Sequence, residues 1–467
     1  MSQLPSEIPR VNQLLYASAS FGSSVLSRAT GLWLVFFYSP PKDEDLPTLV
    51  PRFALGAILL AIGILDAIDD PLIGYWSDRT STRLGRRIPF VLFATPFYAL
   101  FFFLYFTPPG ADNSAFVNAL YITVILFIQR LVGTLSGGPL EALLPEIART
   151  SASRVSIVAW QVFFGSLGAV VGLVATGFIK DSLGFVVMAA VVAIIALVSR
   201  YIALAGVWRY ARTNVEPVHL GVRESLRQAF RNDQFLYFLP TFVFFNLAVT
   251  MLLAALPFFA ESVILDDEES LRLSLLGVSF TLKEGGVSSI LAGAAIVSII
   301  ITLPLTYRLA LRRGKAWIYS AAMLTGSLAF PLLFFMGLIP GIHPLLQSVP
   351  IVALAGVAMA GVFAFPNAIM ADIIDYDSLR TGMRREALYY GAQNTAEKWV
   401  GSLSTALLAT LFLIGETSDN PLGIRLTGPI AGIIAFLGFV YFRGYRLPDH
   451  VTSETVAFEE GRLKVKP

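Results

Sequence analysis

Long apolar runs separated by short polar stretches are the feature that most constrains the fold of this chain. A helix that crosses the hydrocarbon core of a bilayer needs about 20 mostly apolar residues. Runs of this kind cover residues 13–38, 52–76, 88–107, 116–144, 155–179, 185–208, 234–262, 286–309, 316–338, 348–374, 387–415 and 425–445. The sequence therefore predicts an all-α membrane protein with twelve transmembrane helices.

The composition supports this class and excludes several others. Hydrophobic residues make up 55% of the chain and charged residues 14%, whereas a soluble domain has about 25% charged residues. The net charge of +2 gives no reason to expect a nucleic-acid partner. The chain has no cysteine, so it can form neither a disulfide nor a thiolate metal site. The N-terminal residues lack the pattern of a cleavable signal peptide.

Arginine and lysine concentrate in alternate connections between the predicted helices. Connections on one side hold most of them, including Arg79, Arg83, Arg86, Arg87, Arg149, Arg154, Arg209, Arg212, Arg308, Arg312, Arg313, Lys315, Arg380, Arg384 and Arg385. Connections on the other side hold Lys42, Arg52, Lys180, Arg272, Lys283 and Arg425. Basic loops stay in the cytoplasm. We therefore expect a multi-pass protein of the cell membrane with both termini cytoplasmic.

The longest inside connection divides the predicted helices into two groups of six. Basic loops also recur at matching places, after the second and eighth helices and after the fourth and tenth. This echo predicts a parallel repeat of two six-helix bundles, the major facilitator fold. The expected boundaries are an N-terminal bundle at 1–208, a cytoplasmic loop at 209–233, a C-terminal bundle at 234–446 and a cytoplasmic tail at 447–467.

Three carboxylates interrupt the second apolar run. Asp66, Asp69 and Asp70 lie three and four residues apart, so a helix presents them on one face. Charges at this depth are costly unless they line a polar cavity or bind a cation or proton. Pro71 has no N–H, which frees the Ala67 carbonyl as a further oxygen ligand. The alternative is that these acids form ordinary ion pairs near the helix end.

Three stretches resemble one family of transporters. They are "DAIDDPLIGYWSDRTSTRLGRRIPF" (66–90), "GGPLEALLPEIARTSASRVSI" (137–157) and "IMADIIDYDSLRTGMRREALYYGAQNTAEK" (369–398). They look like the signatures of the glycoside–pentoside–hexuronide:cation symporters, the melibiose permease family. The resemblance implies the major facilitator fold, alternating access, and a site for sodium, lithium or a proton between the second and fourth helices.

The resemblance also assigns residues. It implies a cation site at Asp66, Asp70 and Thr134, with Asp69 standing where the permease has an asparagine. Na⁺ at Asp66 and Asp70 is the candidate metal, and the additional acid makes a proton credible instead. The lysine beside the cation and sugar sites matches Lys398.

The sugar site departs further from the family pattern. The permease's two sugar-binding aspartates are replaced by Ser24 and Gly137, so the solute itself is not implied. The candidate substrate-binding residues are Ser24, Arg28, Arg130, Trp160, Phe363, Gln393, Asn394 and Lys398.

Two arginines at spanning depth have two interpretations. Arg28 and Arg130 indicate an anionic solute, which a guanidinium binds bidentately. Equally, they neutralise the aspartates. Ion pairs at the inside ends of the helices are candidate gates that break on inward opening. The candidate gating residues are Asp78, Arg79, Arg83, Arg86, Arg87, Glu141, Asp372 and Asp375.

The combined prediction is a secondary active transporter that couples a proton or sodium ion to a small sugar-like or anionic solute. We expect a monomer whose partners are the solute, the coupling cation and membrane lipid, with no cofactor. The sequence shows no nucleophile–base pair and no phosphate loop, so no enzyme is predicted. One alternative is a lysolipid or amphipath carrier of the same fold. Another is a non-transporting membrane assembly factor, although such a protein has no need of three buried acids.

Overall fold

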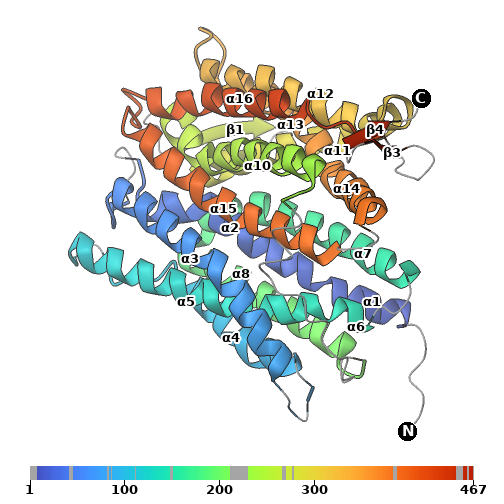
Figure 1. The fold of residues 1–467 in the computed structure, drawn as a ribbon. Coiled ribbons are helices and arrows are strands. Elements are labelled where there is room, and N and C mark those ends of the chain that lie inside the picture. The colour runs from blue at the N-terminus through green and yellow to red at the C-terminus, as the bar shows by residue number, and fades with distance from the viewer. Residues whose placement is uncertain are drawn as a thin grey trace. The chain divides into compact units, whose positions relative to one another are not determined.

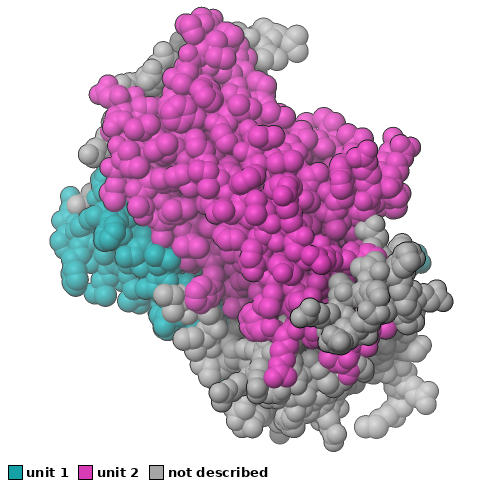
Figure 2. All heavy atoms as spheres, turned by 45° about the horizontal axis from the view of Figure 1, so that its top comes forward, with its two compact units in different colours: residues 1–219, 268–289 teal, residues 220–267, 290–467 magenta. Residues whose placement is uncertain are grey.

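The computed structural model describes residues 8–41, 46–80, 82, 84–85, 87–110, 112–147, 151–210, 230–265, 270–275, 278–381, 386–448, 456–459 and 462–465. These residues are helical apart from short connections and two small β-hairpins (Figure 1). The chain forms two compact units, residues 1–219 with 268–289 and residues 220–267 with 290–467 (Figure 2). The division falls inside one helix, α11 (Glu284–Arg313), after Ser289.

The first unit is a helical bundle. Its elements are α1 (Arg10–Ala17), α2 (Ala19–Tyr38), α3 (Arg52–Arg79), α4 (Ile88–Leu104), α5 (Ala115–Ala142), α6 (Leu144–Ile147), α7 (Ser151–Val170), the π-helical turn η1 (Val171–Ala175), α8 (Thr176–Val207), the strands β1 (Leu271–Leu275) and β2 (Val278–Leu282), and the first turn of α11. Helix α2 packs against α7 and α8, while α4 packs against α5 and α8, and α3 lies against α5.

A single glycine separates two predicted spans within α8. Gly184 has φ 85° and ψ 168°, a conformation that is essentially restricted to glycine, and it interrupts the helix. The break lies where the sequence predicts the boundary between segments 155–179 and 185–208. Helical structure continues to residue 183, however, so Lys180 lies in a helix rather than in the loop expected for it.

An apolar cluster closes the end of this bundle that holds the N-terminal residues. Tyr16 is buried and its hydroxyl donates a hydrogen bond to the Leu140 carbonyl at 2.7 Å. The cluster joins residues from α1, α4, α5, α7 and α8, including Ile8, Tyr16, Ile88, Val91, Leu140, Leu143, Ile157, Leu204 and Val207. Burial of these side chains fixes the helices at this end.

The second unit is also helical. Its elements are α10 (Asp233–Phe259), η2 (Ala260–Leu265), the remainder of α11, α12 (Lys315–Ala329), η3 (Phe330–Phe335), α13 (Pro344–Ala364), α14 (Pro366–Thr381), α15 (Glu386–Phe412), α16 (Leu422–Phe442) and the strands β3 (Val456–Glu459) and β4 (Arg462–Val465). Asn232 caps α10 by accepting from the Gln234 and Phe235 N–H groups. Helix α10 packs against α15 and α16.

The helices confirm the all-α membrane class, and each of the twelve predicted segments coincides with helix among the described residues. By length and apolar composition, seven helical stretches in the described part of the chain can cross a membrane, and Arg52–Gly63 and Ile88–Leu104 are shorter apolar helices. The hairpin β3–β4 in the tail was not predicted. Most of the central loop, residues 211–229, lies outside the described residues. The domain boundaries stay a prediction.

Candidate functional site

Asp66 and Arg130 meet inside the first unit. The Asp66 side chain on α3 is 4% exposed, and its Oδ2 lies 3.7 Å from Nη1 of Arg130 on α5, whose side chain is 41% exposed. A carboxylate this deeply buried needs a cation nearby if it is to stay ionised. The geometry therefore places the Arg130 guanidinium as a countercharge of Asp66 in this conformation.

Helix α5 carries further buried polar groups within about one turn of Arg130. Thr134, one helical turn after Arg130, is buried. Gln129 is buried too, and its Oε1 accepts a hydrogen bond from the Tyr105 hydroxyl at 2.8 Å. The Tyr105 carbonyl in turn accepts from Tyr38 at 2.8 Å. These bonds fix the rotation of α5, and with it the direction from which Arg130 approaches α3.

Part of the predicted cation site and part of the predicted gate lie outside the described residues. The backbone of α3 is helical through the acidic stretch, as the spacing predicts. The side chains of Asp69, Asp70, Asp78 and Arg79 are not among those described, and neither are Arg83 and Arg86. Asp66 is thus the member of the acidic cluster whose surroundings the structure defines.

Arg200 is a buried arginine that the sequence interpretation missed. It lies on α8, donates to the Ser136 hydroxyl on α5, and its guanidinium carbon is 3.8 Å from the centroid of the Tyr98 ring. The signal was available, because the rule that singled out Arg28 and Arg130, a charge within an apolar run, applies equally to Arg200.

The predicted substrate residues of the first unit lie on α2, α5 and α7. Ser24 and Arg28 are partly buried on α2, where Arg28 passes close to Gly172. Trp160 on α7 is partly exposed, and its ring packs edge-on against Phe163 with a centroid distance of 5.8 Å. The structure pairs Arg130 with Asp66, as described above.

In the second unit, the predicted substrate residues lie on α13 and α15. Phe363 on α13 is exposed. On α15, Gln393 is buried, Asn394 is exposed and Lys398 is partly buried. These residues therefore occur on two helices of one unit, and their role in binding stays a prediction.

Two of the predicted gating residues make defined contacts. Arg87, just before α4, donates to the Ala142 carbonyl at the end of α5. Asp372 on α14 is buried, and its carboxylate lies 2.6 Å from Nζ of Lys315, the first residue of α12. Glu141 is exposed and Asp375 is partly buried. Each defined contact joins helices of the same unit.

Three cations assigned by sequence to the outer loops are held by the protein itself. Arg52 donates to the Pro40 carbonyl at 2.9 Å, and Arg425 donates to the Phe334 carbonyl at 2.8 Å. Lys180 is buried and forms ion pairs with Glu284 and Asp181. These three charges therefore stabilise the structure on the side whose connections between helices hold few basic residues.

The chain is similar to one protein family and to several known proteins. A family model described as MFS/sugar transport protein matches residues 15–420. The chain is 24% identical to "Uncharacterized symporter YnaJ" of Bacillus subtilis, over 100% of this chain and 98% of that protein. It is 26% identical to the isoprimeverose transporter of Lactiplantibacillus pentosus, over 48% and 47% of the two chains.

A more distant relative and a solved structure extend the comparison. The chain is 24% identical to the sodium-dependent lysophosphatidylcholine symporter 1 of Mus musculus, over 78% of this chain and 70% of that protein. A crystal structure of a POT family transporter in complex with 5-aminolevulinic acid superposes with a TM-score of 0.63 at 12% identity, over 92% and 94% of the two chains. That likeness shows the major facilitator fold.

Proposed function

Because this chain belongs to the MFS/sugar transport protein family, we propose that it is a cation-coupled symporter of a small sugar-like solute, with Asp66 as a coupling carboxylate. Membership makes the protein a multi-pass membrane transporter of the major facilitator superfamily and not an enzyme. The names of the relatives in Bacillus and Lactiplantibacillus support symport and a sugar-like solute.

The observation that carries the proposal is the buried Asp66 beside the half-exposed Arg130. A coupling carboxylate must exchange its countercharge between states, so that ion binding alters the preferred conformation. Arg130 supplies a countercharge that is covalently part of the chain and whose side chain is 41% exposed. In our proposal, sodium or a proton at Asp66 replaces the guanidinium, and the released Arg130 becomes available to the solute.

This mechanism reconciles the two interpretations of Arg130. In one conformation Arg130 neutralises Asp66, and in another it binds the solute. Because a guanidinium binds carboxylates, this second role favours solutes with a carboxylate or similar anionic group. Thr134, one turn along α5, supplies a further oxygen near the coupling site. Transport then follows alternating access of the two helical bundles.

The test is transport in proteoliposomes with imposed sodium or proton gradients, using sugars, sugar acids and lysolipids as solutes. Asp66→Asn should abolish gradient-driven accumulation of the transported solute while leaving exchange of solute for solute measurable. Asp372→Asn is a matched control, because Asp372 is a carboxylate of similar burial paired with Lys315. Whatever its effect on rate, this control should keep the cation dependence of the parent protein.

Three results would contradict the proposal. Accumulation by Asp66→Asn with unchanged cation dependence would show that Asp66 does not couple. Transport confined to lysolipids would favour the amphipath carrier, an alternative that the name of the mouse relative supports. Absence of transport for every solute would favour the assembly factor.

A further inference from the structure

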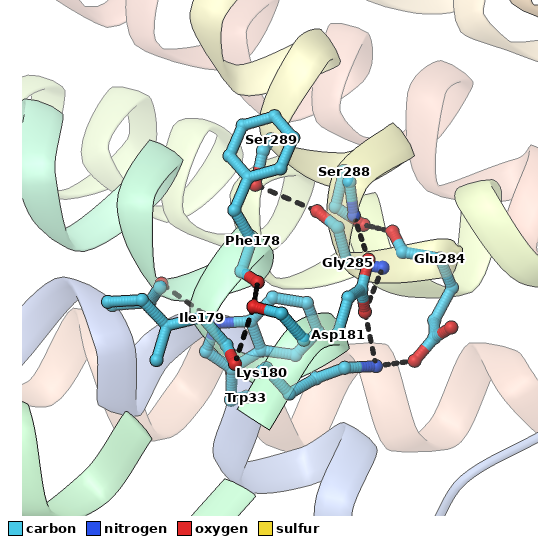
Figure 3. Close-up of polar contacts among 12 residues, drawn as sticks. Trp33, Phe178, Ile179, Lys180, Asp181, Glu284, Gly285, Ser288 and Ser289 are labelled. Atoms are coloured by element: carbon cyan, nitrogen blue, oxygen red, sulfur yellow. Dashed lines mark hydrogen bonds and ion pairs between the residues drawn. The ribbon is translucent and has the colours of Figure 1, made fainter. Parts of the chain in front are cut away.

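A compact polar cluster joins the first part of α8 to the first turn of α11 (Figure 3). Lys180 and Asp181 come from α8, and Glu284, Gly285 and Gly286 begin α11. The Lys180 ammonium forms an ion pair with Glu284 and lies 3.2 Å from Oδ1 of Asp181. Lys180 and Glu284 are 7% and 5% exposed, so the pair is largely removed from solvent.

The same cluster caps the start of α11. The Asp181 carboxylate accepts hydrogen bonds from the backbone N–H groups of Gly285, at 3.2 Å, and Gly286. A carboxylate at a helix N-terminus satisfies N–H groups that have no partner within the helix, and it complements the helix dipole. Asp181 therefore joins α11 to α8 through the backbone as well as through the Lys180 charge.

Aromatic rings hold the lysine in place. The Lys180 ammonium lies 5.2 Å from the Trp33 ring centroid, 5.5 Å from Phe36 and 5.2 Å from Phe185. Trp33 is itself fixed, because its indole N–H donates to the Thr176 hydroxyl at 3.0 Å. Rings at this distance stabilise a cation. Contacts with α2 and α8 therefore position the lysine independently of α11.

The two helices also approach more closely than side chains would allow. A Cβ atom at Gly177 would overlap the Ser289 hydroxyl and the Gly285 carbonyl. A Cβ atom at Gly285 would lie 2.6 Å from the Gly177 carbonyl and would overlap the Asp181 carboxylate. Glycine at both positions therefore makes this contact possible.

We propose that this cluster is a lock at the end of the first unit opposite its N-terminal residues, which must open for the solute pathway to open on that side. The first turn of α11 belongs to the first unit and its remaining residues to the second. A transport step that displaces the body of α11 pulls on its first turn, which the Lys180 and Asp181 contacts hold to α8, so in our proposal these contacts break. Five predicted spans separate this position from the N-terminus, so the expected topology makes it the outer lock.

The absence of cysteine from the chain permits a direct test. Ser289 is fully buried in the contact, and Ser289→Cys introduces a single thiol there. The measurement is the rate at which a membrane-impermeant maleimide, added to the outer side of sealed membrane vesicles, labels this thiol. It requires neither the solute nor the coupling ion, so its failure is distinguishable from failure of the proposed function.

With Lys180→Met, labelling of the thiol should accelerate at least tenfold. Lys283→Met is the matched control, because Lys283 is exposed and directly precedes Glu284, and it should leave the rate within twofold. Glu284→Gln keeps the side-chain shape and removes its charge, so it should accelerate labelling as Lys180→Met does. The double variant Lys180→Met with Glu284→Gln should label no more than about twofold faster than the faster single variant, because both changes break the same ion pair.

Two outcomes would overturn the lock. One is an unchanged rate in both Lys180→Met and Glu284→Gln. The other is a double variant whose acceleration equals the product of the two single effects, because two independent losses of packing would give that result. Gel filtration of each variant in detergent identifies unfolded protein. If Lys180→Met does not fold, the labelling rate of Glu284→Gln decides.

Discussion

Arg130 holds its guanidinium 3.7 Å from the buried carboxylate of Asp66, across the contact between α5 and α3. The pair is asymmetric, because Asp66 is buried while the Arg130 side chain is 41% exposed. A surface ion pair contributes little to stability, but loss of the cation from a buried carboxylate leaves an unsatisfied charge. Because the Arg130 side chain is the more exposed of the two, Arg130 is the partner that can move away while Asp66 stays buried.

Replacement of Arg130 should make the protein depend on external cations for stability. Arg130→Gln removes the guanidinium from Asp66 and should reduce the free energy of unfolding by about 1–3 kcal/mol in buffer without sodium at neutral pH. If the proposal is correct, adding sodium or lowering the pH raises the unfolding temperature of Arg130→Gln by more than it raises that of the parent. Thermal unfolding in detergent measures this.

A double variant controls for other effects of this substitution. In Asp66→Asn with Arg130→Gln, the carboxylate that Arg130 faces is already neutral, so Arg130→Gln should reduce the free energy of unfolding much less than it does in the parent protein. If Arg130→Gln has the same effect in both backgrounds, the two residues are not coupled.

Arg200 should be a structural residue whose removal destabilises the first unit. Arg200→Met loses the stacking on Tyr98 and the bond to Ser136, and we expect a loss of about 2–4 kcal/mol. Ser136→Ala removes one hydrogen bond and should cost about 1 kcal/mol. Equal unfolding temperatures for Arg200→Met and the parent would show that the buried guanidinium does not hold α8 to α5.

Gly184 should tolerate no other residue without strain. Its φ of 85° with ψ of 168° is costly for any side chain, although a Cβ atom added at this position would meet no atom within 4 Å. Gly184→Ala should therefore cost about 1–3 kcal/mol from backbone strain alone.

Gly31 on α2 provides the matched comparison, because a Cβ there also meets nothing within 4 Å and its backbone is helical. Gly31→Ala should be neutral or stabilise by up to about 1 kcal/mol. Similar unfolding temperatures for the two alanine variants would refute the strain at Gly184.

The Lys315–Asp372 pair should couple α12 to α14 in the second unit. Asp372 is buried, so removing Lys315 alone leaves its charge without that partner, and we expect Lys315→Met to cost about 1–3 kcal/mol. A double-mutant cycle with Asp372→Asn should give a coupling energy of about 1–2 kcal/mol. Arg312→Gln, at an exposed position nearby, should change the unfolding free energy by less than about 0.5 kcal/mol. A coupling energy near zero would contradict the pair.

The sequence by itself determined the membrane class, the positions of the apolar helices and the family. These follow from local properties, because each apolar run must bury itself in lipid wherever its neighbours lie. It also identified Asp66 as an acid too deep for an ordinary loop, and Arg130 as a cation at spanning depth, but it left the partner of Arg130 open.

Only the tertiary structure decided which polar groups meet. It placed Arg130 on Asp66 and Arg200 on Ser136, and it moved Lys180 from an expected loop into a buried cluster with Glu284. Gly285, whose N–H Asp181 caps, lies 104 positions after Asp181 along the chain. Such partners depend on helix rotation and on close approach at glycine, which the packing of whole helices sets and no local pattern encodes.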